Sequence, residues 1–213
     1  MLNVKKIKKL SNLSHEEWNK VSSKYINTDK NKLFDEKVGV KDLIDIKEIL
    51  DEENIIFWLI GGTLLGAIRD KDFLYWDDDI DIAVYNEDII PKYDILKNKF
   101  IEKGFIFRDA EKPVGTKINL YRFGQKNSID GLFLNPTYMN NKYRFSRVRK
   151  HPRKYFEEYG EIKFKGMIFR IPYPPEKYLS SMYQNWKKPI KSNRPESEWR
   201  NKKIYWRIKN VKK

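Results

Sequence analysis

Apolar residues recur along this chain with two periods, which predict both helices and strands. Between residues 40 and 50 they fall at helical spacing, which predicts an amphipathic helix. The apolar positions of this helix are Val40, Leu43, Ile44, Ile46, Ile49 and Leu50. Residues 55–60 then form a continuous apolar run that stops at Gly61-Gly62, as in a strand buried on both faces. Helical spacing returns over residues 63–69, so this part of the chain predicts a helix, a strand and a second helix.

A later segment, from Trp76 to Tyr85, alternates acidic and apolar residues. Successive side chains of a strand point to opposite faces, so Asp79 and Asp81 are expected to share one face. By the same alternation, Ile80 and Ile82 are expected to face the core. A run of acids is more often a solvated loop. Acids within a strand are costly to bury without a partner, however, and therefore indicate a site.

The remaining pattern predicts further elements on either side. The sequence Ser14-His15-Glu16-Glu17 matches a capping box, so a short helix is expected from Ser14 to about Tyr25. Pro91 near the start and Gly104 at the end suit a helix over residues 87–103. The other expected elements are strands at residues 105–108, 117–123 and 128–134, a helix near residues 152–159, a hairpin over residues 161–171 and a helix from Pro175. The expected fold class is α/β (α+β), with a mixed β-sheet flanked by helices.

Composition narrows the classes of function. The absence of cysteine excludes disulfides, thiolate zinc sites and a cysteine nucleophile, and two histidines make a His-rich metal site unexpected. The N-terminus has no signal-peptide pattern, and no apolar run reaches membrane-spanning length, so a cytoplasmic location is expected. A net charge of +14 suggests an anionic partner, although lysines that only solvate the surface explain it equally well. The basic ends, Lys5 to Lys9 and Lys202 to Lys213, are expected to be mobile, and peripheral binding to an anionic membrane surface stays open.

Three features carry candidate chemistry. Gly61 and Gly62 lack side chains that would block a phosphate, and they open a helix whose N-terminal N–H groups favour an anion, to which Thr63 adds a hydroxyl. Asp79 and Asp81 can share a divalent cation, because Mg²⁺ characteristically takes one or two carboxylates plus substrate phosphates. Asp130 lies inside a later apolar run and, if that strand is adjacent, supplies a third ligand or a general base. The dipeptide Asp130-Gly131 is also typical of a hairpin turn.

These residues lie within two longer motifs. The first runs from Phe57 to Arg69 as FWLIGGTLLGAIR and continues from Trp76 to Asp81 as WDDDID. It closely resembles the signature of the LicD and fukutin family. A second resemblance to that family joins His151-Pro152, Phe164-Lys165-Gly166 and residues 171–189. On this basis residues 40–190 are expected to form a LicD-like catalytic domain, between basic extensions at residues 1–39 and 191–213.

The resemblance implies a nucleotidyltransferase-like fold and a divalent cofactor, Mg²⁺ or Mn²⁺. It also implies a CDP-linked donor, such as CDP-choline or CDP-ribitol, whose phospho-substituent passes to a glycan hydroxyl, as in lipopolysaccharide biosynthesis, while CMP leaves. The family's metal-binding acids fall on Asp77, Asp79 and Asp81. Arg69 and Lys117 are candidates to hold the donor phosphates, although Lys117 equally suits an ordinary surface lysine.

Two alternatives stay open. A nucleotidyltransferase would move NMP from an NTP to a small hydroxyl compound and release pyrophosphate. An inactive fold would use its positive charge to hold acidic glycan or RNA, with binding that survives loss of Asp79 and Asp81. The inactive fold is the less favoured alternative, because a protein without catalysis has no reason to keep repelling carboxylates together, and nucleic acid is not the expected partner.

Overall fold

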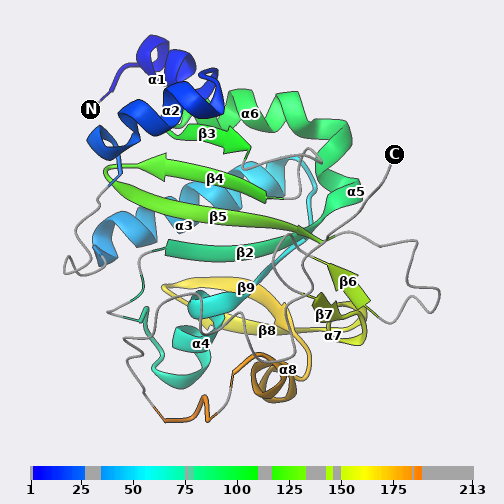
Figure 1. Ribbon diagram of the computed structural model, residues 1–213. Helices are drawn as coiled ribbons and strands as arrows, with labels where there is room; N and C mark the ends of the chain where they lie inside the picture. Colours follow the sequence, from blue (N-terminus) through cyan, green and yellow to red (C-terminus); the bar gives the residue numbers. More distant parts are fainter. Residues whose placement is uncertain are drawn as a thin grey trace.

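A seven-stranded mixed sheet organises the described part of the chain (Figure 1). The computed structural model describes residues 2–26, 35–74, 77, 79–109, 117–132, 143–145, 150–183 and 185–188. The strands of the sheet are β1 (Phe57–Leu59), β2 (Asp79–Tyr85), β3 (Ile106–Asp109), β4 (Lys117–Arg122), β5 (Gln125–Leu132), β8 (Tyr159–Phe164) and β9 (Met167–Pro172). Their order is β3-β4-β5-β2-β1-β9-β8, with β2–β5 and β1–β9 parallel and the other neighbours antiparallel. The predicted α/β class with a mixed sheet is confirmed.

Helices flank the sheet, and a small second sheet lies beside it. The helices are α1 (Val4–Ser11), α2 (His15–Val21), η1 (Ser22–Lys24), α3 (Glu36–Glu52), α4 (Gly61–Arg69), α5 (Asn86–Ile89), η2 (Ile90–Lys92), α6 (Tyr93–Glu102), α7 (Lys154–Glu157) and α8 (Pro175–Met182). The second sheet pairs β6 (Tyr143–Phe145) with β7 (Lys150–Pro152). None of the helices in the described ranges is long and apolar enough to cross a membrane.

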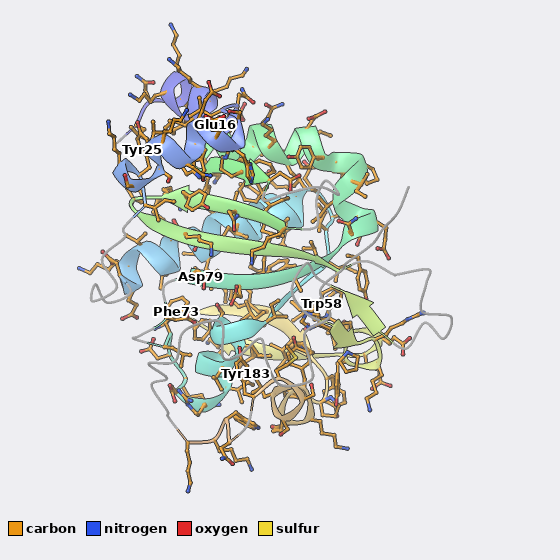
Figure 2. The ribbon with its side chains drawn as sticks, viewed as in Figure 1. Glu16, Tyr25, Trp58, Phe73, Asp79 and Tyr183 are labelled. Carbon is orange, nitrogen blue, oxygen red and sulfur yellow. The ribbon has the colours of Figure 1, made fainter. Side chains whose placement is uncertain are left out.

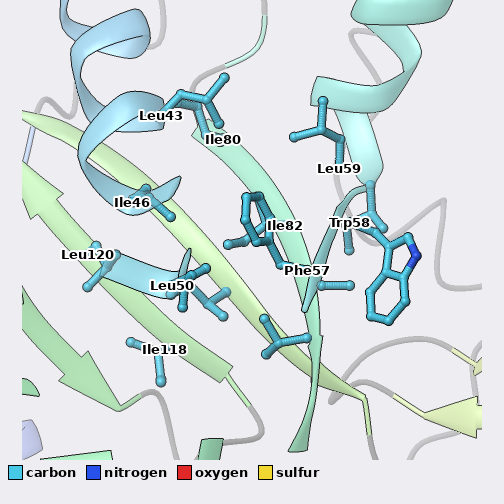
Figure 3. Packing of buried hydrophobic residues seen from close by; sticks show 14 of the residues in the cluster. Leu43, Ile46, Leu50, Phe57, Trp58, Leu59, Ile80, Ile82, Ile118 and Leu120 are labelled. Carbon is cyan, nitrogen blue, oxygen red and sulfur yellow. The ribbon is translucent and has the colours of Figure 1, made fainter. Parts of the chain in front are cut away.

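The main core lies between α3 and one face of the sheet. Ile80 and Ile82 point into it with 0% and 1% of their surface exposed, as their alternation with the acids predicts. Figure 3 shows them packed with apolar side chains of α3, β1 and β4. The labelled partners are Leu43, Ile46, Leu50, Phe57, Leu59, Ile118 and Leu120. The acids of β2 therefore lie on the opposite face, where α4 packs.

The N-terminal helices are part of this core. The predicted capping box is confirmed, since the Ser14 hydroxyl accepts from the Glu17 N–H and the Glu17 carboxylate accepts from the Ser14 N–H. The prediction that Lys5 to Lys9 would be mobile is wrong. This segment forms α1 because Ile7 and Leu10, on one face of the helix, are buried against the sheet, which outweighs the charge of the exposed lysines.

Other boundaries differ from the expected ones for local reasons. Helix α3 begins at Glu36, earlier than predicted, because the Asp35 side chain caps it by accepting from the Val38 N–H. The single helix expected over residues 87–103 is divided into α5, η2 and α6, and Pro91 lies in the 3₁₀ turn η2, where its missing N–H cannot continue an α-helix. Residues 133–134 of the third predicted strand, and the extension 191–213, lie outside the described residues.

Candidate active site

Strand β2 presents its acids on the face that carries α4. Its burial alternates at the start, with Asp79 and Asp81 half-buried and Ile80 and Ile82 fully buried, so the predicted shared face is confirmed. Figure 2 shows Asp79 at the beginning of the strand, well separated from Trp58 on β1. Trp76 and Asp78, from the same motif, lie outside the described residues.

The Gly61-Gly62 turn brings the start of α4 against this strand. Strand β1 runs antiparallel to β2, and the Ile60 N–H donates to the Asp81 carbonyl oxygen at 3.2 Å. Gly61 then turns the chain into the helix with a φ of +58°, a backbone conformation that residues other than glycine rarely adopt. The first turn of α4 is thereby fixed beside the acids.

Both glycines are needed because carboxylates occupy the places where their side chains would be. A Cβ on Gly61 would lie 2.8 Å from the Asp81 Cγ, and one on Gly62 would lie 2.8 Å from the Asp77 Cγ. Each Cβ would come closer still to a carboxylate oxygen, far inside ordinary contact distance. The space expected to receive a phosphate thus receives Asp77 and Asp81 themselves. These two carboxylates lie against consecutive residues at the positive end of a helix, which stabilises negative charge there.

Thr63 holds the acid strand from the helix side. It is 2% exposed, and its hydroxyl oxygen accepts from the Asp81 backbone N–H at 2.9 Å. Its described contact therefore positions Asp81, whereas the sequence suggested a hydroxyl directed at a ligand.

Asp130 lies on the strand next to the acids. Strand β5 runs parallel to β2, with Ser128 opposite Asp81 and Asp130 opposite Ala83. The two strands are thus neighbours, which is the condition under which Asp130 was expected to act with the acids, and its register position is on the face of Asp81. On its other side Asp130 pairs with Lys117 of β4. The backbone brings Lys117 within two strands of the acids.

Arg69 has described contacts far from the glycine turn. It lies at the opposite end of α4, about 12 Å along the helix axis from Gly61. Its guanidinium donates to both carboxylate oxygens of Asp70 at 2.7 Å and to the Trp186 carbonyl at 3.3 Å. The hydrogen bond with Asp70 is the main reason that the pKa of Arg69 is raised. These contacts join α4 to the segment after α8.

Lys126 is a site residue that the sequence reasoning missed. It lies on β5 directly opposite Asp79, and its Nζ lies 3.2 Å from the Asp79 Oδ2. The signal was present in the sequence, because Lys126 precedes Asp130 by an even number of residues and so shares its strand face. Only the pairing of β5 with β2, however, reveals which acid it faces.

A buried polar network fixes β5 from the other face. Asn127 is completely buried opposite Ile80, and its side-chain amide donates to the Asp42 Oδ2 at 2.7 Å. Arg122 donates to the Asp42 Oδ1 at 2.7 Å and lies 2.6 Å from the Asp45 Oδ2. Burial raises the pKa of Asp42, while Arg122 and Asn127 oppose this effect. The network joins α3 to β5 and keeps β5 in register with the acid strand.

Comparison with known families shows which family the chain belongs to. The model of the LicD/FKTN/FKRP nucleotidyltransferase domain matches residues 54–174, which is more than half of the chain. The chain belongs to this family. The matched region begins just before β1 and includes the glycine turn, the acid strand and the β8–β9 hairpin. The resemblance drawn from the sequence motifs is confirmed.

Relatives in the family are distant. An uncharacterised protein of Rickettsia prowazekii is 28% identical over 152 residues, which cover 68% of this chain and 53% of that protein. The human ribitol 5-phosphate transferase FKRP is 21% identical over 145 residues, 62% of this chain and 28% of FKRP. The lipopolysaccharide cholinephosphotransferase LicD of Haemophilus influenzae is 45% identical over 40 residues, 19% of this chain and 15% of LicD. This chain spans about half the length of the first relatives it matches.

Solved structures give a weaker likeness. The lincosamide antibiotic adenylyltransferase LnuA aligns with 68% of this chain and 86% of its own, at 13% sequence identity and a TM-score of 0.47.

The LicD family implies a divalent metal, and the described residues offer part of a ligand set. Asp77 and Asp81 bring carboxylates to neighbouring residues of one helical turn, and Asp79 shares the strand face of Asp81. Among the described residues, no group of three or more acidic or histidine side chains could hold a metal by itself. Two carboxylates still fit Mg²⁺, which takes waters and substrate phosphates as its other ligands.

The β8–β9 turn holds the loop that leads to the acids. Lys165 in this turn places its Nζ 2.6 Å from Glu36 Oε1 and 2.5 Å from Asp72 Oδ1. Phe164 packs edge-on against Phe73 with ring centroids 5.0 Å apart. Asp72 and Phe73, which follow α4 in the chain, are thereby fixed to a hairpin far away in the sequence.

Replacing Lys165 by Met should lower the free energy of unfolding by about 0.5–1 kcal/mol at neutral pH, because Asp72 and Glu36, both largely exposed, lose their ion pairs with it. The hydrogen bond from Lys165 is the main reason that the pKa of Asp72 is lowered. The difference from wild type should therefore be present at neutral pH and shrink as the pH falls through the folded-state pKa of Asp72. Urea denaturation at several pH values measures this. The exposed Lys163 of the same hairpin, changed to Met, is the control. Equal losses of unfolding free energy in both variants would contradict a stabilising role of the contacts of Lys165.

Proposed function

We propose that this chain is a metal-dependent transferase that moves a phospho-substituent, phosphocholine or a polyol phosphate, from a CDP-linked donor to a glycan hydroxyl. Membership of the LicD family supports a transferase. Two relatives, a ribitol 5-phosphate transferase and a lipopolysaccharide cholinephosphotransferase, support a phosphorylated alcohol as the transferred group.

The close approach of two carboxylates to the glycine turn is the main support for this proposal. The carboxylates of Asp77 and Asp81 are held directly against the backbone of Gly61 and Gly62, with no room for a single methyl group between them. Strand and helix are therefore built around two carboxylates at the start of α4, and such oxygen ligands suit a divalent cation that takes its other ligands from water and substrate phosphates. A catalytic metal site explains why two glycines and two acids are combined in this way.

Asp77 and Asp81 would hold Mg²⁺ or Mn²⁺ at the start of α4, and Asp79 would join them as a ligand once its carboxylate leaves Lys126. Thr63 keeps Asp81 in place by accepting a hydrogen bond from the Asp81 backbone N–H. The bound ion would supply charge neutralisation at the transferred phosphoryl group. Asp130, on the neighbouring strand, would accept the proton of the attacking glycan hydroxyl. Lys117, opposite Asp130 in the register, would contribute positive charge near the donor.

A thermal-shift panel tests the donor class. CDP-choline, CDP-ribitol, CTP, ATP and UDP-sugars are each added with and without Mg²⁺, because a ligand that binds the native state raises its melting temperature. We expect shifts with CDP-linked compounds that require Mg²⁺ and are absent in Asp79→Asn. Comparable shifts with NTPs, followed by release of pyrophosphate instead of CMP, would identify a nucleotidyltransferase. No shift with any of these nucleotides would contradict both enzymes.

A further inference from the structure

Lys126 lies at the edge of the proposed metal site. Its Nζ contacts the Asp79 Oδ2 at 3.2 Å, and the side chains of Lys126 and Asp79 are 35% and 14% exposed. The contact follows from the sheet itself, because β2 and β5 are parallel and place the two residues directly opposite each other. It therefore does not depend on the conformation of a loop.

The neighbours of Lys126 limit where its ammonium group can go. Tyr121 lies opposite it on β4 and is 7% exposed, and cross-strand neighbours on one face are about 5 Å apart. Trp18 of α2 packs on Tyr121 with ring centroids 5.3 Å apart, and Tyr25 stacks on Trp18 at 6.2 Å. Burial is the main reason that the pKa of Tyr121 is raised, so this side chain stays neutral beside Lys126. Aromatic rings thus fill the β4 side, while the acids and the start of α4 lie on the other side.

We infer that Lys126 is a mobile counterion of the site, which neutralises Asp79 in the resting protein and moves to the phosphates of the donor when metal and donor bind. This inference rests on the proposed function. A divalent ion ligated by Asp79 would compete with Lys126 for the same carboxylate, and the two positive charges repel each other at short range. Lysine is a compact charge on a flexible four-carbon stem, so its ammonium can be displaced by several ångströms without moving β5. The nearest new anion would be the donor phosphates brought in with the metal.

The inference predicts effects of opposite sign when Lys126 is replaced by Met. Loss of the competing charge should strengthen Mn²⁺ binding to the nucleotide-free protein by about two- to fivefold, the range expected for a partly exposed ion pair. Loss of a charge-assisted hydrogen bond should weaken binding of the CDP-linked donor, at saturating Mn²⁺, by at least about tenfold. Replacing a residue with only a structural role would not strengthen the binding of one ligand and weaken the binding of the other.

Isothermal titration calorimetry on the whole chain measures both affinities, with CDP-choline and CDP-ribitol as donor probes. Lys163→Met, an exposed lysine on β8, is the charge-matched control and should change neither affinity. Lys126→Arg keeps the charge and should restore donor affinity to within about threefold of wild type. Melting temperatures identify any variant that fails to fold, and if Lys126→Met does not fold, Lys126→Gln removes the same charge with a polar side chain and carries the same two expected effects.

Two results would overturn the inference. If wild type binds both ligands but Lys126→Met behaves like Lys163→Met, Lys126 is an ordinary surface residue while the proposed function stands. If Lys126→Met weakens both ligands equally, Lys126 only supports the structure of the site. Absence of Mn²⁺ and donor binding in wild type would instead reject the proposed function, and the inference with it.

Discussion

Asp81→Asn should reduce phospho-transfer by at least about a thousandfold while the protein remains folded. Asp81 supplies one of the two carboxylates held against the glycine turn, and an amide in its place has no negative charge with which to bind a divalent ion. The backbone contacts of Asp81 with Ile60 and Thr63 involve its carbonyl and N–H groups, so the substitution leaves them intact. Losing the repulsion from Asp77 and losing the attraction to the start of α4 act in opposite directions, so the melting temperature should stay close to that of wild type.

Release of CMP at saturating Mg²⁺, together with Mn²⁺ titration calorimetry, measures this effect. Asp94→Asn is a matched control, because Asp94 is an exposed acid on α6 outside the site. Wild-type turnover in Asp81→Asn would refute the proposed mechanism. An unfolded Asp81→Asn protein would show that the carboxylate has a structural role that the present contacts do not predict.

Gly61→Ala should weaken metal binding by about ten- to a hundredfold and lower activity with it, although it adds only one methyl group. The new Cβ would collide with the Asp81 carboxylate, so either Asp81 or the first turn of α4 must move. Displacements of groups that orient metal ligands typically cost about ten- to a hundredfold in metal affinity. The positive φ of Gly61 adds a backbone penalty of about 1–2 kcal/mol for any residue with a Cβ.

Gly166→Ala separates these two costs. Gly166 also has a positive φ, of +84°, but a Cβ there would meet no atom within 4 Å. Its Ala variant should therefore lose about 1–2 kcal/mol of stability and keep full metal affinity. Chemical denaturation and Mn²⁺ calorimetry compare the pair. Equal metal affinities in the two variants would show that the glycine turn does not position Asp81.

Much of the fold could be predicted from local pattern. The alternation from Asp79 to Ile82 correctly predicted a strand with one acidic and one buried face, since strand geometry alone fixes the direction of successive side chains. The capping box at Ser14 was correct for a similar reason, because all its hydrogen bonds lie within four residues. That α1 packs on the protein could not be predicted from its own residues, because Ile7 and Leu10 become buried only against a sheet built from later residues.

The candidate site also has a part that local sequence predicted and a part that it could not predict. The sequence motif alone identified Gly61, Gly62, Asp77, Asp79 and Asp81, because these residues lie in one contiguous unit of strand, turn, helix and strand. It could not show that the carboxylates themselves fill the space left by the glycines, which depends on the path of the loop between α4 and β2. Nor could it show that the described contacts of Arg69 are with Asp70 and Trp186, because the latter contact joins residues far apart in the chain.

By itself, the sequence determined the family, the acid strand and the glycine turn, because each depends on residue types at short, fixed spacing. Only the tertiary structure decided the partners of these residues. Lys126 meets Asp79, and Lys165 meets Asp72, across 47 and 93 residues of chain. Such contacts depend on strand order and register, which result from the packing of the whole core and leave no local pattern in the sequence.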